Sequence, residues 1–326
     1  MDMIKYSYTT EVQFMGDVNL VYVFLNNNFL NSGQQKNIGK YSYNTLPEYY
    51  IDTLKYNNTK ASNTYFIMQD AEIDAHKNKL PDNVQLVSAD ELAATEEYKA
   101  VWDILYNNWN RYLNDPFWYN TFIRVILICI FQRKYSIENV VHIEADNLIF
   151  GDFTKLNIFE SGEFGFSNEC PYSSAPSFIY LKDRRSATNL LNMHIQMLDK
   201  GESTIQPYTG WLGAWITDMA FLDLIYRSGK NYKMLPCLPE GPFSQNFDKI
   251  GYVFDPTSYG MFLGGSNNGH PKGFIDGKHY IGQAIHNKLI NVKFDSKPYI
   301  VYNNKEIPVF NLHVHNKKSI EGFLNG

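Results

Sequence analysis

The sequence predicts a single α/β domain with a central mixed sheet flanked by helices. Short apolar runs typical of buried strands, at Val18–Leu25, Thr64–Met68 and Val84–Ser88, alternate with segments of helical pattern. That alternation favours a mostly parallel sheet. The chain has 326 residues, of which 44% are hydrophobic, and this is enough apolar material for one large core.

The first predicted strand, Val18–Leu25, is followed by the polar run Asn26-Asn-Asn28. In a parallel nucleotide-binding sheet, this loop lies at the carboxyl edge where a base and ribose bind. Asn26 is therefore a candidate nucleotide contact, although a plain solvent loop explains the run equally well. Further along, Pro47–Leu54 predicts a short helix, and Ser88-Ala-Asp-Glu91 has the pattern of a capping box that opens a covering helix.

A helix is expected from about Phe117 to Tyr135, with Asp115 as N-cap and Pro116 in the first helical position. This helix is apolar on nearly every side except at Arg124. A buried guanidinium needs an anionic partner, because its desolvation costs several kcal/mol. The partner is either a structural carboxylate or a phosphate or hydroxyl of a substrate, and the residues leave both open.

The stretch Asn139–Phe153 reads as an apolar strand that ends in the acidic pair Glu144 and Asp146, before a turn at Gly151-Asp152. In extended backbone the two carboxylates share one face, because side chains alternate along a strand. Mg²⁺ or Mn²⁺ carrying a substrate diphosphate would relieve their repulsion. Acidic residues at a surface strand end are the alternative. The apolar lead-in favours the metal, because it places the pair at the carboxyl end of a buried strand.

The second half of the chain predicts a strand at Pro176–Leu181 and an amphipathic helix at Ser186–Leu198, a possible wall of an acceptor cleft. Thr217 or Asp218 caps the next helix. Asp218 is either a structural acid of the first helical turn or the group that meets an acceptor hydroxyl as general base. The pair Gly264-Gly265 either makes a turn or lets backbone N–H groups approach a sugar or diphosphate.

A late strand is expected at Val309–His315, where alternation places His313 and His315 on one face. One imidazole of such a pair can bind a metal while the other donates to a phosphate, and Lys317 or Lys318 can neutralise a departing diphosphate. A lone histidine is usually structural, whereas this concentration favours a site. The sequence does not decide whether His313 or His315 binds the metal.

Composition excludes several classes of protein. The 29 basic residues are outnumbered by 34 acidic ones, giving a formal charge of −5, and without a long basic run nucleic acid is not an expected partner. Cys129, Cys170 and Cys237 are widely separated, which suggests neither a disulfide framework nor a zinc site. No secretory signal and no membrane-spanning run is recognisable, so a cytoplasmic protein is expected.

A family resemblance joins these segments. The stretch His142-Ile-Glu-Ala-Asp-Asn-Leu-Ile-Phe150, with Arg124 on the preceding helix and Phe310-Asn-Leu-His-Val-His-Asn-Lys317 far downstream, resembles the metal-binding core of GT-A fold, nucleotide-sugar-dependent glycosyltransferases. The resemblance runs from about Val18 to Phe323. It implies a Rossmann-like sheet, with a nucleotide-sugar half at about 18–152 and an acceptor-binding and closing half at about 153–326.

For the site, the resemblance implies a variant of the family's Asp-x-Asp motif. Glu144 stands at the first position and orients the metal shell or the ribose, Asp146 is the inner metal ligand, and a late histidine completes the shell. Arg124 then acts on the donor, and Gly264 and Gly265 lie near the donor sugar.

The implied activity is metal-dependent transfer of a monosaccharide from a nucleotide-diphosphate sugar to a hydroxyl of a glycan, protein or other acceptor. The late-histidine resemblance leans towards retention of the anomeric configuration, with a phosphate oxygen taking the acceptor proton. An inverting enzyme would instead use Asp218 as base. In either case the metal, Mn²⁺ or Mg²⁺, and Lys317 would stabilise the departing diphosphate.

Two other functions are compatible with the same fold. A sugar nucleotidyltransferase would also use paired acids, but it should carry a glycine-rich phosphate loop with a basic residue after the first strand, and Val18–Lys40 lacks one. A non-catalytic carbohydrate-binding or structural protein would not need the acid pair or the late histidines. Both are therefore less favoured than the transferase.

Overall fold

The computed structural model describes residues 16–26, 29, 45–109, 116–170, 173–201, 217–267, 269–275, 277 and 279–325. Asn27, Asn28 and the expected N-cap Asp115 lie outside this part of the chain. Within it, no helix is both long enough and apolar enough to cross a membrane.

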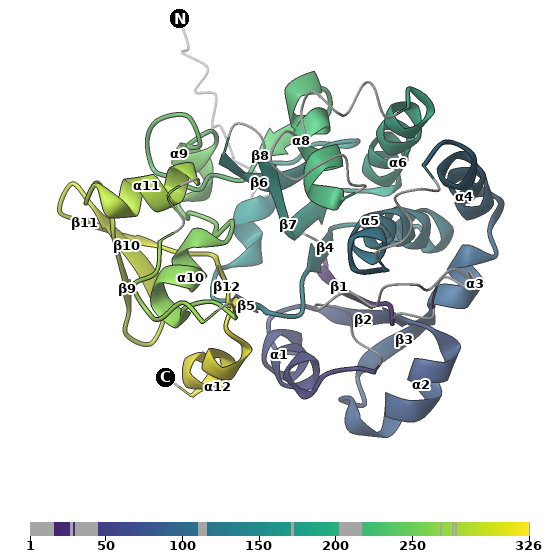
Figure 1. Cartoon of the computed structure of the whole chain (residues 1–326), viewed down its shortest axis with the longest axis horizontal. Helices are drawn as coiled ribbons and strands as arrows, with labels where there is room; N and C mark the ends of the chain where they lie inside the picture. Colours follow the sequence, from purple (N-terminus) through teal and green to yellow (C-terminus); the bar gives the residue numbers. More distant parts are fainter. Residues whose placement is uncertain are drawn as a thin grey trace, which may run out of the picture.

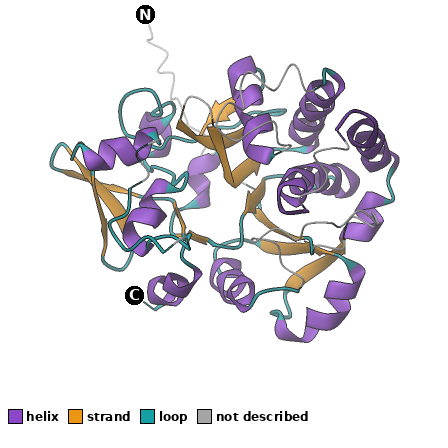
Figure 2. Ribbon diagram, viewed as in Figure 1, coloured by secondary structure: helices purple, strands orange, loops and turns teal. Residues whose placement is uncertain are grey.

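A seven-stranded mixed sheet forms the centre, in the order β3-β2-β1-β4-β7-β6-β8 (Figures 1 and 2). Strands β1 to β4 run parallel, β7 is antiparallel to both β4 and β6, and β8 is parallel to β6. The predicted α/β architecture with a central mixed sheet is therefore confirmed. The strands are β1 Asn19–Phe24, β2 Asn63–Met68, β3 Val84–Ser88, β4 Val140–Ile143, β6 Phe164–Cys170, β7 Ser173–Leu181 and β8 Tyr232–Met234.

Helices cover both faces of this sheet. The long helix α5 is apolar all round because it lies against the sheet and is enclosed by neighbouring helices, and Figure 1 shows it between α4, α6 and the strands. On the opposite face, α1 packs its buried Ile51 and Leu54 against β1 and β2. The helices of this part are α1 Glu48–Asn58, α2 Asp70–His76, α3 Ala89–Ala93, α4 Glu96–Trp109, α5 Pro116–Tyr135, α6 Arg184–Asp199 and α8 Asp218–Ser228.

Several helix boundaries follow the expected chemistry. Ser88 caps α3 by accepting the Glu91 N–H at 2.9 Å, but the covering helix is interrupted after Ala93 and resumes as α4. Helix α6 begins at Arg184, because Asp183 and Ser186 form a reciprocal capping box. This helix packs into the core against α5.

The C-terminal part adds a second, smaller layer that Figure 1 shows on the left, where β9 to β11 form an antiparallel sheet beside α10 and α11. A third sheet consists of β5 and β12, which pair antiparallel although they lie far apart in the sequence. The elements are β5 Asn147–Ile149, β9 Asn291–Phe294, β10 Pro298–Tyr302, β11 Lys305–Pro308, β12 Asn311–His313, α9 Phe247–Ile250, α10 Ser258–Gly264, α11 Tyr280–His286, α12 Ile320–Leu324 and the 3₁₀ segments η1 Lys77–Lys79, η3 Phe153–Leu156 and η5 Lys317–Ser319.

Candidate functional site

The acidic pair lies on a turn between two strands. β4 ends at Ile143, and the Asn147 N–H donates to the Glu144 carbonyl at 3.0 Å, which closes the turn. Ser177 on β7 holds this turn in place, since its carbonyl accepts the Glu144 N–H at 3.1 Å and the Asn147 side-chain amide at 2.7 Å. The backbone is not extended across Glu144 and Asp146, because a turn at Ala145 and Asp146 leads into β5. The two carboxylates nevertheless lie close together, as expected, since one imidazole nitrogen of His313 is within 3.3 Å of both.

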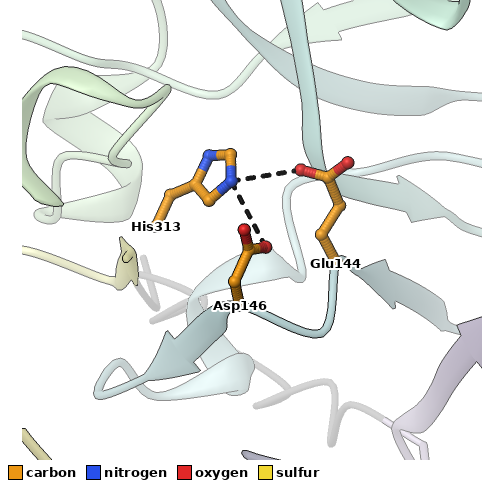
Figure 3. Close-up of side chains that lie close together, drawn as sticks. All are labelled: Glu144, Asp146 and His313. Atoms are coloured by element: carbon orange, nitrogen blue, oxygen red, sulfur yellow. Dashed lines mark ion pairs between the residues drawn. The ribbon is translucent and has the colours of Figure 1, made fainter. Parts of the chain in front are cut away.

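The turn brings the early motif to the late one. In the β5–β12 pair, Asn147 lies opposite His313, and the Asn311 amide donates to Asn147 Oδ1 at 3.0 Å. His313 Nε2 is 3.3 Å from Glu144 Oε2 and 3.3 Å from Asp146 Oδ1. Figure 3 shows the imidazole pointing at both carboxylates. The expected strand at 309–315 is reduced to Asn311–His313, so His315 lies beyond its end.

These three side chains fit a divalent metal. Each offers one ligand atom, and the atoms lie within 4.8 Å of one another. An ion about 2.1 Å from each of two ligands at right angles separates those ligands by about 3 Å, close to the 3.3 Å seen from His313 Nε2 to either carboxylate. Two carboxylates with one imidazole suit Mn²⁺ or Mg²⁺. His313 Nδ1 lies 3.4 Å from the Pro256 carbonyl, an arrangement that directs Nε2 towards the acids.

Two cationic side chains balance the charge of Asp146. Lys317 Nζ contacts Asp146 Oδ2 and lies 5.5 Å from the centre of the Tyr49 ring. Burial acts to raise the pKa of Asp146, but Lys317 and His313 outweigh it and hold that pKa well below its usual range. Burial likewise acts to lower the pKa of His313, whereas Asp146 and Glu144 raise it to about 9. The site therefore places two cationic groups at the carboxylates that could hold a metal.

Arg124 connects this cluster to helix α8. Its Nη2 is 2.6 Å from Glu144 Oε1 and 2.6 Å from Asp218 Oδ2, so protein carboxylates are its partners. Burial acts to lower the pKa of Arg124, but the two carboxylates raise it above the usual value. Its buried Nε has no hydrogen-bond partner in the described part of the chain. Arg124 thus joins the Glu144 turn to the start of α8.

Asp218 is the first residue of α8, and Thr217 is the N-cap, because Thr217 Oγ1 accepts the Ala220 N–H at 3.1 Å. Both oxygens of Asp218 are engaged, Oδ2 by Arg124 and Oδ1 by the Met219 N–H at 2.8 Å. Burial raises the pKa of Asp218 despite the nearby Arg124. The carboxylate is placed as an anchor for the arginine.

Asn26 is buried at the carboxyl end of β1. Its N–H donates to Gln69 Oε1 at 2.8 Å, its amide donates to Glu72 Oε1 at 2.7 Å, and its Oδ1 accepts from Gln69 Nε2 at 3.0 Å. The interpretation as a plain solvent loop is therefore wrong for this residue. Its side chain joins the ends of β1 and β2.

His315 adjoins the cluster, with its ring centre 4.5 Å from that of His313. Burial lowers the pKa of His315 well below its usual value, and the neighbouring His313 adds to this effect. Its Nε2 is buried and has no hydrogen-bond partner within the described residues.

The glycine pair ends helix α10. Gly265 adopts a φ of +81° as the C-cap, and its N–H donates to the Met261 carbonyl at 2.8 Å. A Cβ at this position would lie 2.5 Å from the His270 carbonyl oxygen. The Gly264 carbonyl accepts from the Asn316 amide at 3.1 Å. These glycines thus fix the local path of the chain beside the late motif.

Asp255 is a residue of the site region whose role the sequence pattern did not reveal. It is fully buried and accepts the N–H groups of Tyr259, Gly260 and His313 at 2.9, 2.8 and 2.9 Å. Burial raises its pKa to about 6 against these hydrogen bonds. It ties the start of α10 to β12. The Asp-Pro sequence before a helix was the available signal, because such an aspartate caps helices.

Several buried polar side chains on β6 and β7 had no signal in the sequence. One hydroxyl or amide nitrogen of each has no hydrogen-bond partner in the part of the chain described here, and one of these residues, Ser177, lies at the Glu144 turn. Buried polar atoms are rarely left unsatisfied, and buried water is their usual partner where no protein group serves. The atoms are the hydroxyls of Ser167, Ser174 and Ser177 and the amide nitrogen of Asn168.

No protein-family model and no curated protein matches the sequence. Solved structures similar in fold include mouse xyloside xylosyltransferase 1, at 13% identity over 68% of this chain and 85% of that one, with a TM-score of 0.46. The glycosyltransferase GlyE of Streptococcus pneumoniae TIGR4 is 11% identical over 67% of this chain, which spans 45% of GlyE, with a TM-score of 0.36. CTP:phosphocholine cytidylyltransferase of Streptococcus pneumoniae is 13% identical over 69% of this chain and 91% of that one, with a TM-score of 0.28.

Proposed function

We propose that this protein is a metal-dependent glycosyltransferase that moves a monosaccharide from a nucleotide-diphosphate sugar to an acceptor hydroxyl. The observation that carries the proposal is the convergence of Glu144, Asp146 and His313 within 4.8 Å, with Lys317 at the same carboxylate. A substrate diphosphate needs both a divalent cation and a mobile basic group, and this arrangement can supply both.

In this proposal Asp146 and His313 hold the metal, and Glu144 contributes Oε2 while its Oε1 stays on Arg124. Once bound, Mn²⁺ or Mg²⁺ supplies electrostatic stabilisation to the diphosphate oxygens. His315, whose Nε2 has no partner among the described side chains, serves the donor phosphates. The choice between the two histidines as metal ligand falls on His313, because its Nε2 already faces both carboxylates.

Lys317 stabilises the leaving diphosphate. Its ammonium group contacts Asp146, and its side chain retains 21% exposure, so it can turn without burying an unpaired charge. On donor binding the ammonium exchanges the carboxylate for a phosphate oxygen. The negative charge that develops as the sugar leaves is then met by a cation of the protein.

The sugar lies beside Arg124, whose side chain is 11% exposed and whose guanidinium can donate to sugar hydroxyls. Asp218 keeps Arg124 in position. Because both Asp218 oxygens already accept hydrogen bonds, it is a poor general base, and this supports transfer with retention of configuration.

The half of the chain up to about residue 152 binds the donor nucleotide. The remainder of the chain binds the acceptor. Asn26 lies at the carboxyl end of β1 and contributes by shaping the base end of the donor site, since its own amide is held by Glu72. Gly264 contributes by accepting the Asn316 amide of the late motif, and Gly265 by allowing the turn that ends α10 at a positive φ.

Calorimetric titration with UDP-, GDP- and TDP-sugars, with and without Mn²⁺, tests the proposal. We expect one nucleotide class to bind only with Mn²⁺, and Asp146→Asn to weaken that binding by about 100-fold, as loss of a metal ligand should. Asp248→Asn, an exposed change on α9, is the control and should bind like the wild type.

Binding of every donor without regard to Mn²⁺ or Asp146 would refute the metal site. Release of pyrophosphate from a nucleoside triphosphate and a sugar 1-phosphate would instead establish a nucleotidyltransferase. Once a transfer product is obtained, NMR of its anomeric centre decides between retention and inversion, and an inverted centre contradicts the role given to Asp218.

A further inference from the structure

A second hollow lies beyond the metal cluster, on the C-terminal layer. It has a volume of about 670 Å³ and opens between α10, α12, β9 and the loop at Lys272, elements that Figure 1 shows grouped below and to the left of the large sheet. Small-molecule sites typically measure about 300–1,000 Å³, so this one can hold a ligand. Its walls combine the aromatic rings of Phe262, Phe294 and Phe323 with Lys272, Lys318 and Ser319.

The charge of the hollow is one-sided. Lys272 and Lys318 are exposed and form no ion pair with a described carboxylate, and no acidic side chain is among the lining residues that the structure describes. This differs from the chain as a whole, whose formal charge is −5. Two cations without a counter-charge in a hollow attract an anionic group.

Hydrogen bonds and ring contacts hold the walls of the hollow in place before any ligand binds. The Gly273 N–H donates to the Phe262 carbonyl at 2.7 Å and so ties the Lys272 loop to α10. The Ser319 hydroxyl donates to the Gly264 carbonyl at 2.9 Å. Phe294 and Phe323 meet edge to face with ring centres 4.9 Å apart. A preformed hollow binds a ligand without spending free energy on ordering its walls.

A separate hollow of about 420 Å³ shares Lys318 as a lining residue with the first one. Its other walls include Tyr49 and Lys317, which contacts Asp146, and also the acids Asp52 and Glu321. The larger hollow, which has no acidic side chain among its described lining residues, is therefore the one of the two that suits an anion.

We infer that this hollow binds an acidic saccharide, in which a carboxylate lies between Lys272 and Lys318 and the apolar face of a pyranose ring packs on Phe262 and Phe294. Half-buried aromatic rings offer apolar faces for such a ring, and the lysines select the charged sugar over a neutral one. The inference that the hollow binds an acidic saccharide does not depend on the proposed function. Its role as an outlying part of the acceptor site rests on the proposed function.

Titration of the full chain with a disaccharide containing glucuronic acid, and with the same disaccharide containing glucose, tests the inference. We expect the acidic disaccharide to bind about tenfold more tightly at low salt, and Lys272→Gln to remove most of that difference. Lys249→Gln, an exposed lysine on α9 outside the hollow, is the matched control and should retain it.

Equal affinity for the two disaccharides would overturn the inference, as would an acidic preference that Lys272→Gln leaves intact. Displacement of the disaccharide by a free nucleoside monophosphate would also overturn it, because the hollow would then belong to the donor. Metal-dependent donor binding, measured on the same Lys272→Gln protein, should be unchanged. Absence of donor binding by the wild-type protein would count against the proposed transferase, but it would not contradict the inference about the saccharide site.

Discussion

Two carboxylates, one fully buried and the other 15% exposed, contact the same histidine and differ in almost every other respect. Asp255 accepts the backbone N–H of His313, together with those of Tyr259 and Gly260. Asp146 faces the ring of His313 and the ammonium group of Lys317. Burial leaves the pKa of Asp255 raised to about 6, whereas the cations hold the pKa of Asp146 well below its usual range.

The difference separates a structural acid from an exchangeable one. The partners of Asp255 are backbone groups that cannot leave without unfolding α10 or β12, and they satisfy it fully. The partners of Asp146 are side chains, the buried ring of His313 on β12 and the 21% exposed side chain of Lys317 on η5, of which the lysine can turn into solvent. A metal can replace side-chain cations, but it cannot replace backbone amides. Burial alone therefore does not distinguish an acid that a metal could bind from one that the fold requires; the nature of its partners does.

The largest expected loss of stability is at Gly260, where α10 lies against the backbone of β12. A Cβ there would overlap the backbone carbonyl of His313, and neither backbone can move without breaking the hydrogen bonds to Asp255. Gly260→Ala should lower the free energy of unfolding by about 3 kcal/mol or more. Chemical denaturation measures this.

Gly322→Ala is the matched control, since the same methyl group at that position of α12 meets nothing within 4 Å. Its stability should stay at or slightly above that of the wild type, because alanine favours helix over glycine. Comparable losses in the two variants would show that the close approach of α10 to β12 is not as described.

Asp255→Asn should have the next largest effect. The amide group keeps the shape but loses acceptor capacity, so at least one of the buried N–H groups of Tyr259, Gly260 and His313 is left unpaired. The free energy of unfolding should fall by about 2 kcal/mol. Urea denaturation compares this variant with Asp248→Asn on the exposed side of α9, for which no change is expected. A neutral Asp255→Asn would contradict the structural role.

Much of the framework was readable from the sequence. The strand at Val84–Ser88 and the helix start at Pro116 were predicted at the residues where they occur, because apolar runs and proline leave strong local signals. The apolar helix around Arg124 was also recognised, as was the proximity of Glu144, Asp146 and the late histidines, through a family resemblance.

Non-local contacts account for what was missed. The residues Glu144-Ala-Asp146 carry no local signal for a turn. The turn leads into β5, whose partner strand β12 lies more than 160 residues away in the sequence. The partners of Arg124 were left open for the same reason, since Asp218 is 94 residues away. The unpartnered serines of β6 and β7 depend on packing that no local pattern encodes.

Replacing Asp146 should change the free energy of unfolding little and the affinity for Mn²⁺ greatly. In Asp146→Asn, Lys317 can turn into solvent and His313 can lose its proton, so the metal-free stability should stay within about 1 kcal/mol of the wild type. Mn²⁺ at 100 times its dissociation constant should stabilise the wild type by about 2.7 kcal/mol. It should not stabilise Asp146→Asn, whereas Asp255→Asn should keep the full gain. Thermal unfolding with and without Mn²⁺ measures each term. Equal Mn²⁺ stabilisation of both variants would erase the distinction between the two acids.

The smallest expected effect is on the Mn²⁺ affinity of a Lys317 variant. The direction of that change is the informative result. Its ammonium group competes with a metal for Asp146 Oδ2, so Lys317→Met should bind Mn²⁺ about threefold to fivefold more tightly, as removal of a partly exposed ion pair allows. Sugar transfer should fall in the same variant, because the departing diphosphate loses a cation. Lys318→Met is the adjacent control for Mn²⁺ affinity, since no ion pair joins Lys318 to a described carboxylate. Weaker Mn²⁺ binding in Lys317→Met would mean that the lysine supports the metal site and does not compete for it, and the partners of Asp146 would then be as fixed as those of Asp255.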